Sequence, residues 1–345
     1  MKRNFLMPVA AVLLLSALVP ACHKSDTLDY LNDPEGNFKA LWETVDRHYC
    51  YFEEKHIDWD SIYTVYAPQA KNNLSAYNLF MLLSQMVNEL KDGHVNLSSP
   101  FASSYYKGWW ADYPQNFNER VVLQNYLEFD YDRLGAYTYG VVKNRNIGYI
   151  RVSSFTSSLG EGNLDWIFYR LGTANGLILD LRDNGGGELT ASEQLASRFI
   201  FTRTLAGYVS HKTGPGHDQF SEPKEFYYNP PEEPHLVWGK PVVVLTNRST
   251  FSAANQLASF MKTRGGNIVV AGDTTGGGSG LPMSMSIPIG WTIRMSASPM
   301  LDSDGRSNEW GVAPTPGHRV DAPDSEYALG RDMIIEHAIN YLSDL

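Results

Sequence analysis

The sequence predicts an α/β fold in which a largely parallel sheet is flanked by helices and preceded by a small helical subdomain. Continuous apolar runs have the length of strands buried on both faces; these are residues 147–152, 176–181, 241–246 and 268–271. Helical patterns alternate with these runs, at residues 164–171, 189–200 and 252–261. Such alternation is typical of βαβ units. Two amphipathic patterns, at 37–51 and 74–90, precede all of these segments and predict the helical subdomain.

The rest of the chain completes this division. Residues 283–295 predict a hairpin with Ile289-Gly290 at its turn, and 329–342 predict a closing helix. We expect a signal peptide at 1–21, a tether at 22–36, the helical subdomain at 37–97 and the α/β core at 98–345.

The segment from 98 to 132 is rich in aromatic and turn-forming residues. We expect a packed connector there, and the alternative is an aromatic wall beside a cleft.

The N-terminus predicts export. Lys2 and Arg3 precede an apolar run at 5–19, which is too short for a comfortable transmembrane helix. Leu18-Val19-Pro20-Ala21-Cys22 resembles a bacterial lipobox, which implies cleavage before Cys22 and a lipid on its sulfur. We therefore expect a bacterial cell-envelope protein anchored to a membrane, on the periplasmic or the outer-surface side. The alternative is an ordinary secretory signal with an incidental cysteine.

Composition and the absence of certain motifs limit the classes of ligand and partner that we expect this protein to bind. The formal net charge of −10 argues against nucleic acid, because a phosphate backbone requires a basic surface. The chain has two cysteines, so lipidation of Cys22 leaves Cys50 without a disulfide partner. There is no P-loop, His-Glu-x-x-His motif or cysteine cluster. We expect neither a metal nor a cofactor, and the oligomeric state stays open.

Three segments carry residues suited to catalysis. Gly185-Gly186-Gly187 follows a predicted strand, and free amides in such a turn can bind an anion or an oxyanion. Ser252 lies where another strand gives way to a helix, near the positive end of the helix dipole. A helix cap is the commonest role for serine at that place. His94 follows Gly93 just beyond a helix end, and histidine is the usual base for a serine nucleophile.

Five motifs, in order, resemble the C-terminal processing peptidase family of serine peptidases, also called tail-specific proteases. They are Phe38-x-x-Leu41-Trp42-x-x-Val45-Asp46, Asp92-Gly93-His94, Asp180-Leu181-Arg182-x-Asn184-x-Gly186-Gly187, Thr250-x-Ser252-Ala253 and Glu309-Trp310-Gly311-Val312-x-Pro314. The tricorn-type branch is the most similar. The resemblance implies a ClpP/crotonase-like core and a serine-type peptidase acting on peptides or proteins.

The same resemblance implies the site residues. Ser252 would be the nucleophile, His94 its general base and Glu309 the acid that orients His94. The amides of Ala253 and of Gly186 or Gly187 would form the oxyanion hole. Asp304 is the alternative to Glu309.

The sequence departs from the family pattern at three places. The processing branch uses a lysine base where this chain has Thr274-Thr275-Gly276-Gly277-Gly278, which favours the histidine-dependent branch. Between Val95 and Ile147 there is too little chain for the PDZ module that many members carry. Asn255 occupies the position of the usual glutamate.

Two other functions remain as alternatives. Ser259-x-x-Lys262 fits the first motif of penicillin-binding proteins and β-lactamases, but the Lys-Thr-Gly motif of that class is missing. The second alternative is a non-catalytic peptide- or glycan-binding lipoprotein that keeps the peptidase fold.

Overall fold

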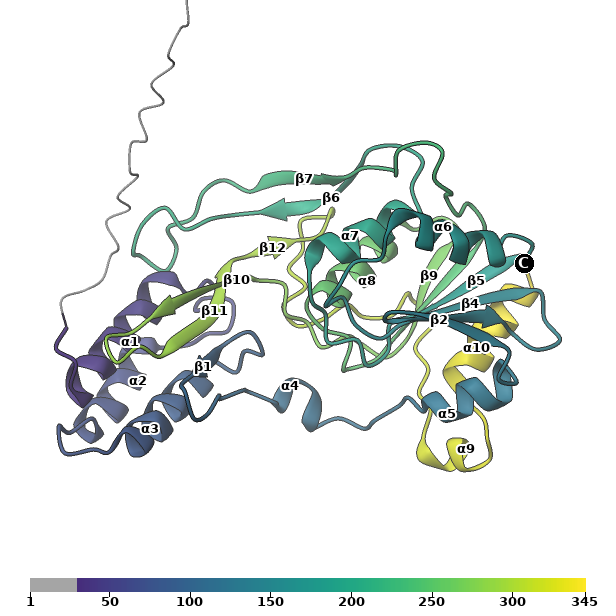
Figure 1. Cartoon of the computed structure of the whole chain (residues 1–345). Coiled ribbons are helices and arrows are strands. Elements are labelled where there is room, and N and C mark those ends of the chain that lie inside the picture. Colours follow the sequence, from purple (N-terminus) through teal and green to yellow (C-terminus); the bar gives the residue numbers. More distant parts are fainter. Residues whose placement is uncertain (1–29) are drawn as a thin grey trace, which may run out of the picture.

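The computed structural model describes residues 30–345. The predicted signal peptide and the predicted lipidation site at Cys22 lie outside the described residues. Figure 1 shows a smaller N-terminal body of helices and short strands beside a larger α/β body. Within the described residues no helix is long and apolar enough to cross a membrane.

The larger body contains a six-stranded sheet in the order β2-β3-β4-β5-β8-β9. Its strands are β2 (Tyr131–Leu134), β3 (Tyr137–Val141), β4 (Ile147–Val152), β5 (Gly176–Asp180), β8 (Val242–Thr246) and β9 (Ile268–Gly272). The last four are parallel, and β2 and β3 form an antiparallel edge. The parallel strands are buried throughout, which explains their continuous apolar sequences.

Helices cover both faces of this sheet, so the predicted α/β class is confirmed. One face packs against α6 (Glu161–Arg170), α7 (Leu189–Ser197) and α8 (Ala253–Arg264). The other packs against α5 (Glu119–Val121), the π-helical turn η2 (Val122–Tyr126), α9 (Asp324–Ala328) and α10 (Met333–Ser343). Figure 1 shows these two helical layers on either side of the strands.

The N-terminal body differs from the predicted subdomain at both of its boundaries. It contains α1 (Pro34–His48), α2 (Trp59–Tyr66), η1 (Ala67–Gln69), α3 (Ala76–Asn88) and β1 (Asn96–Ser98). Helix α1 begins inside the predicted tether, because Asp33 caps it and Pro34 suits its first turn. The predicted hairpin, β10 (Leu281–Ser286) and β11 (Thr292–Ser298), pairs with β1 and packs its apolar side on these helices. The 98–345 segment is therefore not a separate body.

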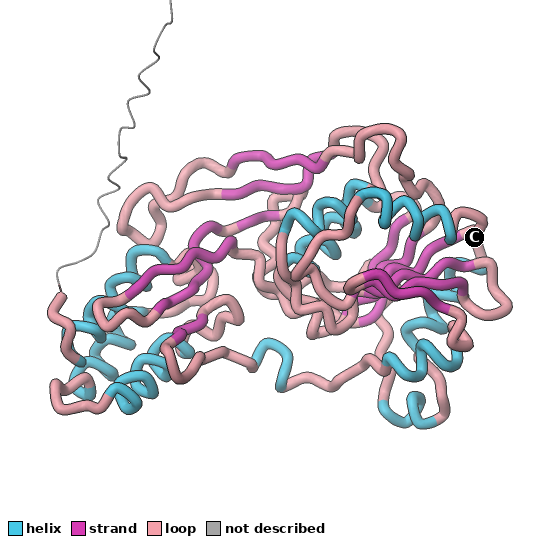
Figure 2. Tube along the Cα trace, viewed as in Figure 1, coloured by secondary structure: helices cyan, strands magenta, loops and turns pink. Residues whose placement is uncertain are grey.

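The remaining elements connect the two bodies. One connection is a small antiparallel sheet of β6 (Thr204–Val209), β7 (Lys224–Tyr228) and β12 (Met300–Leu301). The other is the segment between β1 and α5, which contains α4 (Gly108–Ala111). Figure 2 shows both connections spanning the space between the bodies. The sequence did not predict β2, β3, β6 or β7, because their inward and outward positions do not alternate with a clear period of two. Between β1 and β4 the described chain forms short helices and a hairpin, and no PDZ domain.

A buried ion network holds the end of β5 in place. Arg182 is fully buried and binds Asp180, which lies two residues earlier, and Asp332 at the N-cap of α10. Tyr149 donates a hydrogen bond to Asp180 at 2.9 Å. The Asp180-Leu181-Arg182 part of the glycine motif is thus structural: it fixes the strand end from which the glycine turn departs.

Candidate active site

Ser252 has an unusual backbone conformation for an L-residue. It is the N-cap of α8, with φ of 56° and ψ of −121°, and its side chain makes no capping hydrogen bond. Its amide donates to the Gly277 carbonyl at 2.9 Å, and the Phe251 amide donates to the Asn184 carbonyl at 3.0 Å. These bonds hold a conformation that would otherwise be unfavourable. The hydroxyl that a simple cap would use is left for another partner.

That partner is His94. Its Nε2 atom lies 2.9 Å from Ser252 Oγ, although the two residues are 158 positions apart in the chain. His94 comes from the N-terminal body, just before β1, and Ser252 from the larger body, so the pair joins the two. His94 is 4% exposed, and its ring packs on Phe251, with ring centroids 4.9 Å apart. The structure thus brings two of the three predicted catalytic residues into contact.

Glu309 lies elsewhere than predicted. One of its carboxylate oxygens accepts the Ser279 amide at 2.9 Å, and the other is 2.8 Å from Lys55 Nζ. Within residues 30–345 the His94 Nδ1 atom is buried and makes no hydrogen bond of normal geometry, to Glu309 or to any other group. The Gly280 carbonyl is close enough to raise the pKa of His94. A direct Glu309–His94 contact is therefore not found.

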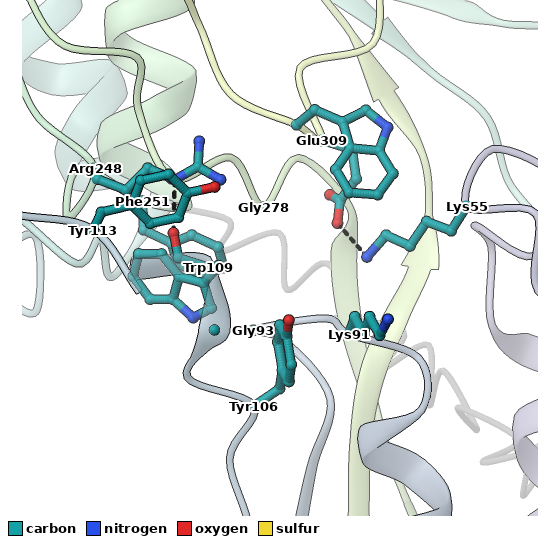
Figure 3. Close-up of a pocket in the computed structure, with 13 residues that line it drawn as sticks. Lys55, Lys91, Gly93, Tyr106, Trp109, Tyr113, Arg248, Phe251, Gly278 and Glu309 are labelled. Carbon is teal, nitrogen blue, oxygen red and sulfur yellow. Dashed lines mark hydrogen bonds and ion pairs between the residues drawn. The ribbon is translucent and has the colours of Figure 1, made fainter. Parts of the chain in front are cut away.

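Lys55 was not foreseen from the sequence. Its side chain is 3% exposed, and its ammonium group contacts Glu309 (Figure 3). The same ammonium group lies 3.2 Å from the carboxylate of Asp92, so Lys55 bridges the two acids. Asp92 also accepts hydrogen bonds from the His94 amide, the Tyr49 hydroxyl and the Ser296 hydroxyl. Residues 53–56 form a charged run, which usually indicates an exposed surface, so no signal in the sequence distinguished Lys55.

Burial and these neighbours set the charges. Burial opposes ionisation of Asp92, but Lys55, His94 and the hydrogen bonds keep its pKa below the usual value. Burial and the charge of Asp92 raise the pKa of Glu309 to about 7, against the effect of Lys55. Burial lowers the pKa of His94 to about 4; Asp92 opposes this shift, and Arg294 and Lys55 add to it. His94 is therefore neutral at pH 7 and can accept a proton.

The glycine turn presents one of its two predicted amides. The Gly186 amide donates to the Asn184 side chain at 2.9 Å, so it is not free for an oxyanion, which corrects the prediction for this residue. A Cβ atom on Gly186 would lie 2.8 Å from the Cβ of Ser252, so only glycine fits. Gly187 borders the same cavity as Ser252 and His94. Neither the Gly187 nor the Ala253 amide donates a backbone hydrogen bond to another described residue.

Asn255 has a structural role that explains the departure from the usual glutamate. Its side chain accepts the Thr275 hydroxyl at 2.6 Å and donates to the Asn308 carbonyl at 3.2 Å. Thr275 in turn accepts the Val312 amide at 2.6 Å. Asn255 thus ties the glycine-rich segment after β9 and the loop of Glu309 to the first turn of α8, whereas a carboxylate could not donate to the carbonyl.

The aromatic segment also reaches the site, in contrast to the packed connector that we expected. Trp109 stacks on Phe251, with ring centroids 4.1 Å apart. With Tyr106 and Tyr113 it lines a cavity of about 190 Å³. Figure 3 shows these rings facing Lys55 and Glu309 across the cavity. The aromatic wall that was the alternative describes these residues better.

A strained serine in contact with a buried, neutral histidine, close to backbone amides without a backbone partner, is the arrangement of a serine hydrolase. Residues 146–316 match Peptidase family S41, and residues 30–88 match the Tricorn protease C1 domain. The chain belongs to the S41 family of serine-type peptidases, the family of the C-terminal processing proteases.

Individual relatives agree with this assignment. A protein of Parabacteroides merdae ATCC 43184 with a known crystal structure is 42% identical in sequence to this chain. The two structures superpose with a TM-score of 0.84, and the match covers 90% of this chain and 97% of that one. Carboxy-terminal processing protease CtpA of Bacillus subtilis (strain 168) is 29% identical over 174 residues, which are 50% of this chain and 34% of CtpA. The match thus spans about a third of that relative's length. Mature CPAF shares the fold at 12% identity, with a TM-score of 0.62 over 90% of this chain and 97% of that chain.

Proposed function

We propose that this protein hydrolyses peptide bonds through an acyl-enzyme on Ser252, with His94 as the general base. Ser252 Oγ attacks the peptide carbonyl carbon while its proton passes to His94 Nε2. His94 then returns this proton to the leaving nitrogen as the C–N bond breaks. Water then attacks the ester carbonyl carbon while its proton passes to His94. As the bond to Ser252 Oγ breaks, His94 returns that proton to Oγ, which releases the carboxylic acid and restores Ser252. The 2.9 Å approach of Nε2 to Oγ is the observation that carries the proposal.

The oxyanion formed in both steps would be held by the amides of Ala253 and Gly187. Ala253 is the first residue of α8, so the helix dipole adds to its amide. Gly186 would serve by its small size, which lets the turn approach Ser252.

Glu309 would orient His94 indirectly. Its bond to the Ser279 amide fixes the segment whose next residue, Gly280, places a carbonyl near the imidazole. That carbonyl would favour the tautomer with its proton on Nδ1, which leaves Nε2 free to accept the proton of Ser252.

A fluorophosphonate probe tests the chemistry. The wild-type protein should be labelled, and Ser252→Ala should not be. Peptide hydrolysis should fall by roughly 10³-fold or more in Ser252→Ala and in His94→Ala, as for other serine hydrolases. Full activity of His94→Ala would remove the proposed base. If neither labelling nor hydrolysis occurs under any condition, the protein is a peptide- or glycan-binding lipoprotein with a peptidase fold.

We also propose that Cys22 carries a lipid and anchors the protein in the bacterial cell envelope. This rests on the lipobox-like sequence from Leu18 to Cys22. Metabolic labelling with an alkyne fatty acid should mark the wild-type protein and leave Cys22→Ala unmarked. Labelling of the variant would contradict the proposal.

A further inference from the structure

A small cavity of about 60 Å³ adjoins Ser252 and His94 and contains one further ionisable side chain, Arg294. The other residues around it are glycine, apolar or neutral polar, among them Leu281, Pro282 and Met300. Among the residues that the structure describes, no carboxylate borders the cavity. A cation therefore lies at the reacting centre with no anion beside it in the same space.

The register of the small sheet explains why Arg294 points there. In β11, Ile293 and Met295 are buried among the N-terminal helices, so Arg294 between them lies on the opposite face. Its cross-strand neighbours are Asn96 in β1 and Ser284 in β10, which are both uncharged. Arg294 makes no ion pair with a carboxylate within residues 30–345 at up to 4.0 Å.

The other interior arginines contrast with it. Arg182 binds two carboxylates, and Arg198 binds Glu161 and Asp165. Asp92, the carboxylate that acts on Arg294 through space, is already paired with Lys55 and accepts three hydrogen bonds. Burial lowers the pKa of Arg294, which indicates that the loss of hydration is not balanced within the protein.

We propose that Arg294 determines specificity by binding a substrate carboxylate next to the scissile bond. This inference rests on the proposed peptidase function. A planar guanidinium binds a carboxylate through paired hydrogen bonds, which are stronger than neutral ones. Two sources supply such a carboxylate: an aspartate or glutamate side chain at the cleavage site, or the free C-terminus of a peptide cleaved close to its end.

Binding to the inactive Ser252→Ala protein tests Arg294 independently of catalysis. Three matched fluorescent peptide pairs separate the sources: Glu against Gln on the acyl side of the bond, Glu against Gln on the amine side, and a free against an amidated C-terminus. We expect one pair to differ by about ten- to a hundred-fold in Kd, the range for a charge-assisted hydrogen bond. That preference for the carboxylate should disappear in Arg294→Met. In Arg294→Glu it should reverse, so that a peptide with lysine at the same position binds more tightly than the peptide with the carboxylate. The matched control is Arg145→Met in the same Ser252→Ala protein, because Arg145 is exposed. This variant should leave the ratio of the two Kd values in each pair unchanged.

Equal Kd values within all three pairs, or a preference that survives Arg294→Glu, would overturn the inference. Fluorophosphonate labelling and peptide hydrolysis by the protein with Ser252 intact report separately on the proposed function. An active peptidase without a carboxylate preference therefore removes only the role of Arg294. An unlabelled, inactive protein that shows the preference removes only the chemistry.

Discussion

Strain at Ser252 is maintained by its neighbours on both sides. A non-glycine residue in such a conformation costs about 1–3 kcal/mol, and the bonds to Gly277 and Asn184 hold it. The conformation keeps the hydroxyl out of the capping position and directs it to His94. Since that choice depends on residues 25 and 68 positions away, local sequence at Ser252 predicts only a cap.

The pH dependence of activity follows from the burial of His94. The base must be neutral, so activity is lost as the pH falls through the pKa of His94, which burial lowers to about 4. An unperturbed histidine would place this loss near pH 6.5. We expect kcat/KM for a peptide without ionisable side chains to stay level from pH 7 to about 5 and to fall below that. A loss centred at pH 6–7 that persists in Glu309→Gln, which removes the carboxyl group with a pKa of about 7, would show that water reaches His94 in the working enzyme.

Lys55 should be essential to stability because it neutralises two buried carboxylates. In Lys55→Met, Asp92 and Glu309 would face each other unpaired, and removal of one partner from a buried ion pair costs about 3–5 kcal/mol. Urea unfolding measures this loss. The double variant Lys55→Met, Glu309→Gln removes one of the two uncompensated buried carboxylates and should recover part of the lost stability. A Lys55→Met protein as stable as wild type would contradict the bridging role.

These residues show what the sequence could predict about the site. Ser252 and His94 were predicted because they lie in ordered motifs, and the structure brings them into contact. Glu309 was predicted as the partner of His94, but it contacts Lys55, which lies in a charged run with no motif. Arg294 was also missed, because an arginine in a hairpin strand usually indicates an exposed face.

At the scale of elements, the glycine turn shapes the site. Gly186 has a φ of 93° and no room for a methyl group beside Ser252, while Gly185 has no atom within 4 Å of its added Cβ. The two residues are adjacent, which makes Gly185→Ala a matched control for Gly186→Ala.

We expect Gly186→Ala to reduce kcat/KM by about 10²-fold or more, as when an oxyanion donor is displaced. Gly185→Ala should stay close to wild type. Circular dichroism should show both variants folded, so that the loss is local to the turn. Equal activity of the two variants would mean that the turn does not need its close approach to Ser252.

Strands differed in how well the sequence revealed them. The four parallel strands are buried on both faces, so their apolar runs were readable without tertiary information. Strands β6 and β7 are paired with each other across a loop, and only three of their eleven positions are buried. Their pattern arises from packing that only the folded chain supplies.

At the scale of the whole molecule, the site is shared between two bodies that are joined by strand pairing. His94 lies two residues before β1, which pairs with β11, a strand from the C-terminal part of the chain. Such pairing between distant segments leaves no local trace, which is why the sequence did not show that β10 and β11 pack on the N-terminal helices. The N-terminal helices and the α/β core should therefore unfold together.

Ile293 tests this cooperativity. It is fully buried against the N-terminal helices, although it lies in β11, beyond the whole parallel sheet in sequence. Ile293→Ala should lower the free energy of unfolding by about 2–5 kcal/mol, as for other buried large-to-small changes. Ile178→Ala, on the core sheet, is the matched control and should shift the same transition. Far-UV circular dichroism and tryptophan fluorescence should report one coincident transition for each variant. If Ile293→Ala produces an early transition that Ile178→Ala does not, the two bodies unfold separately and the catalytic pair is joined only in the final docked state.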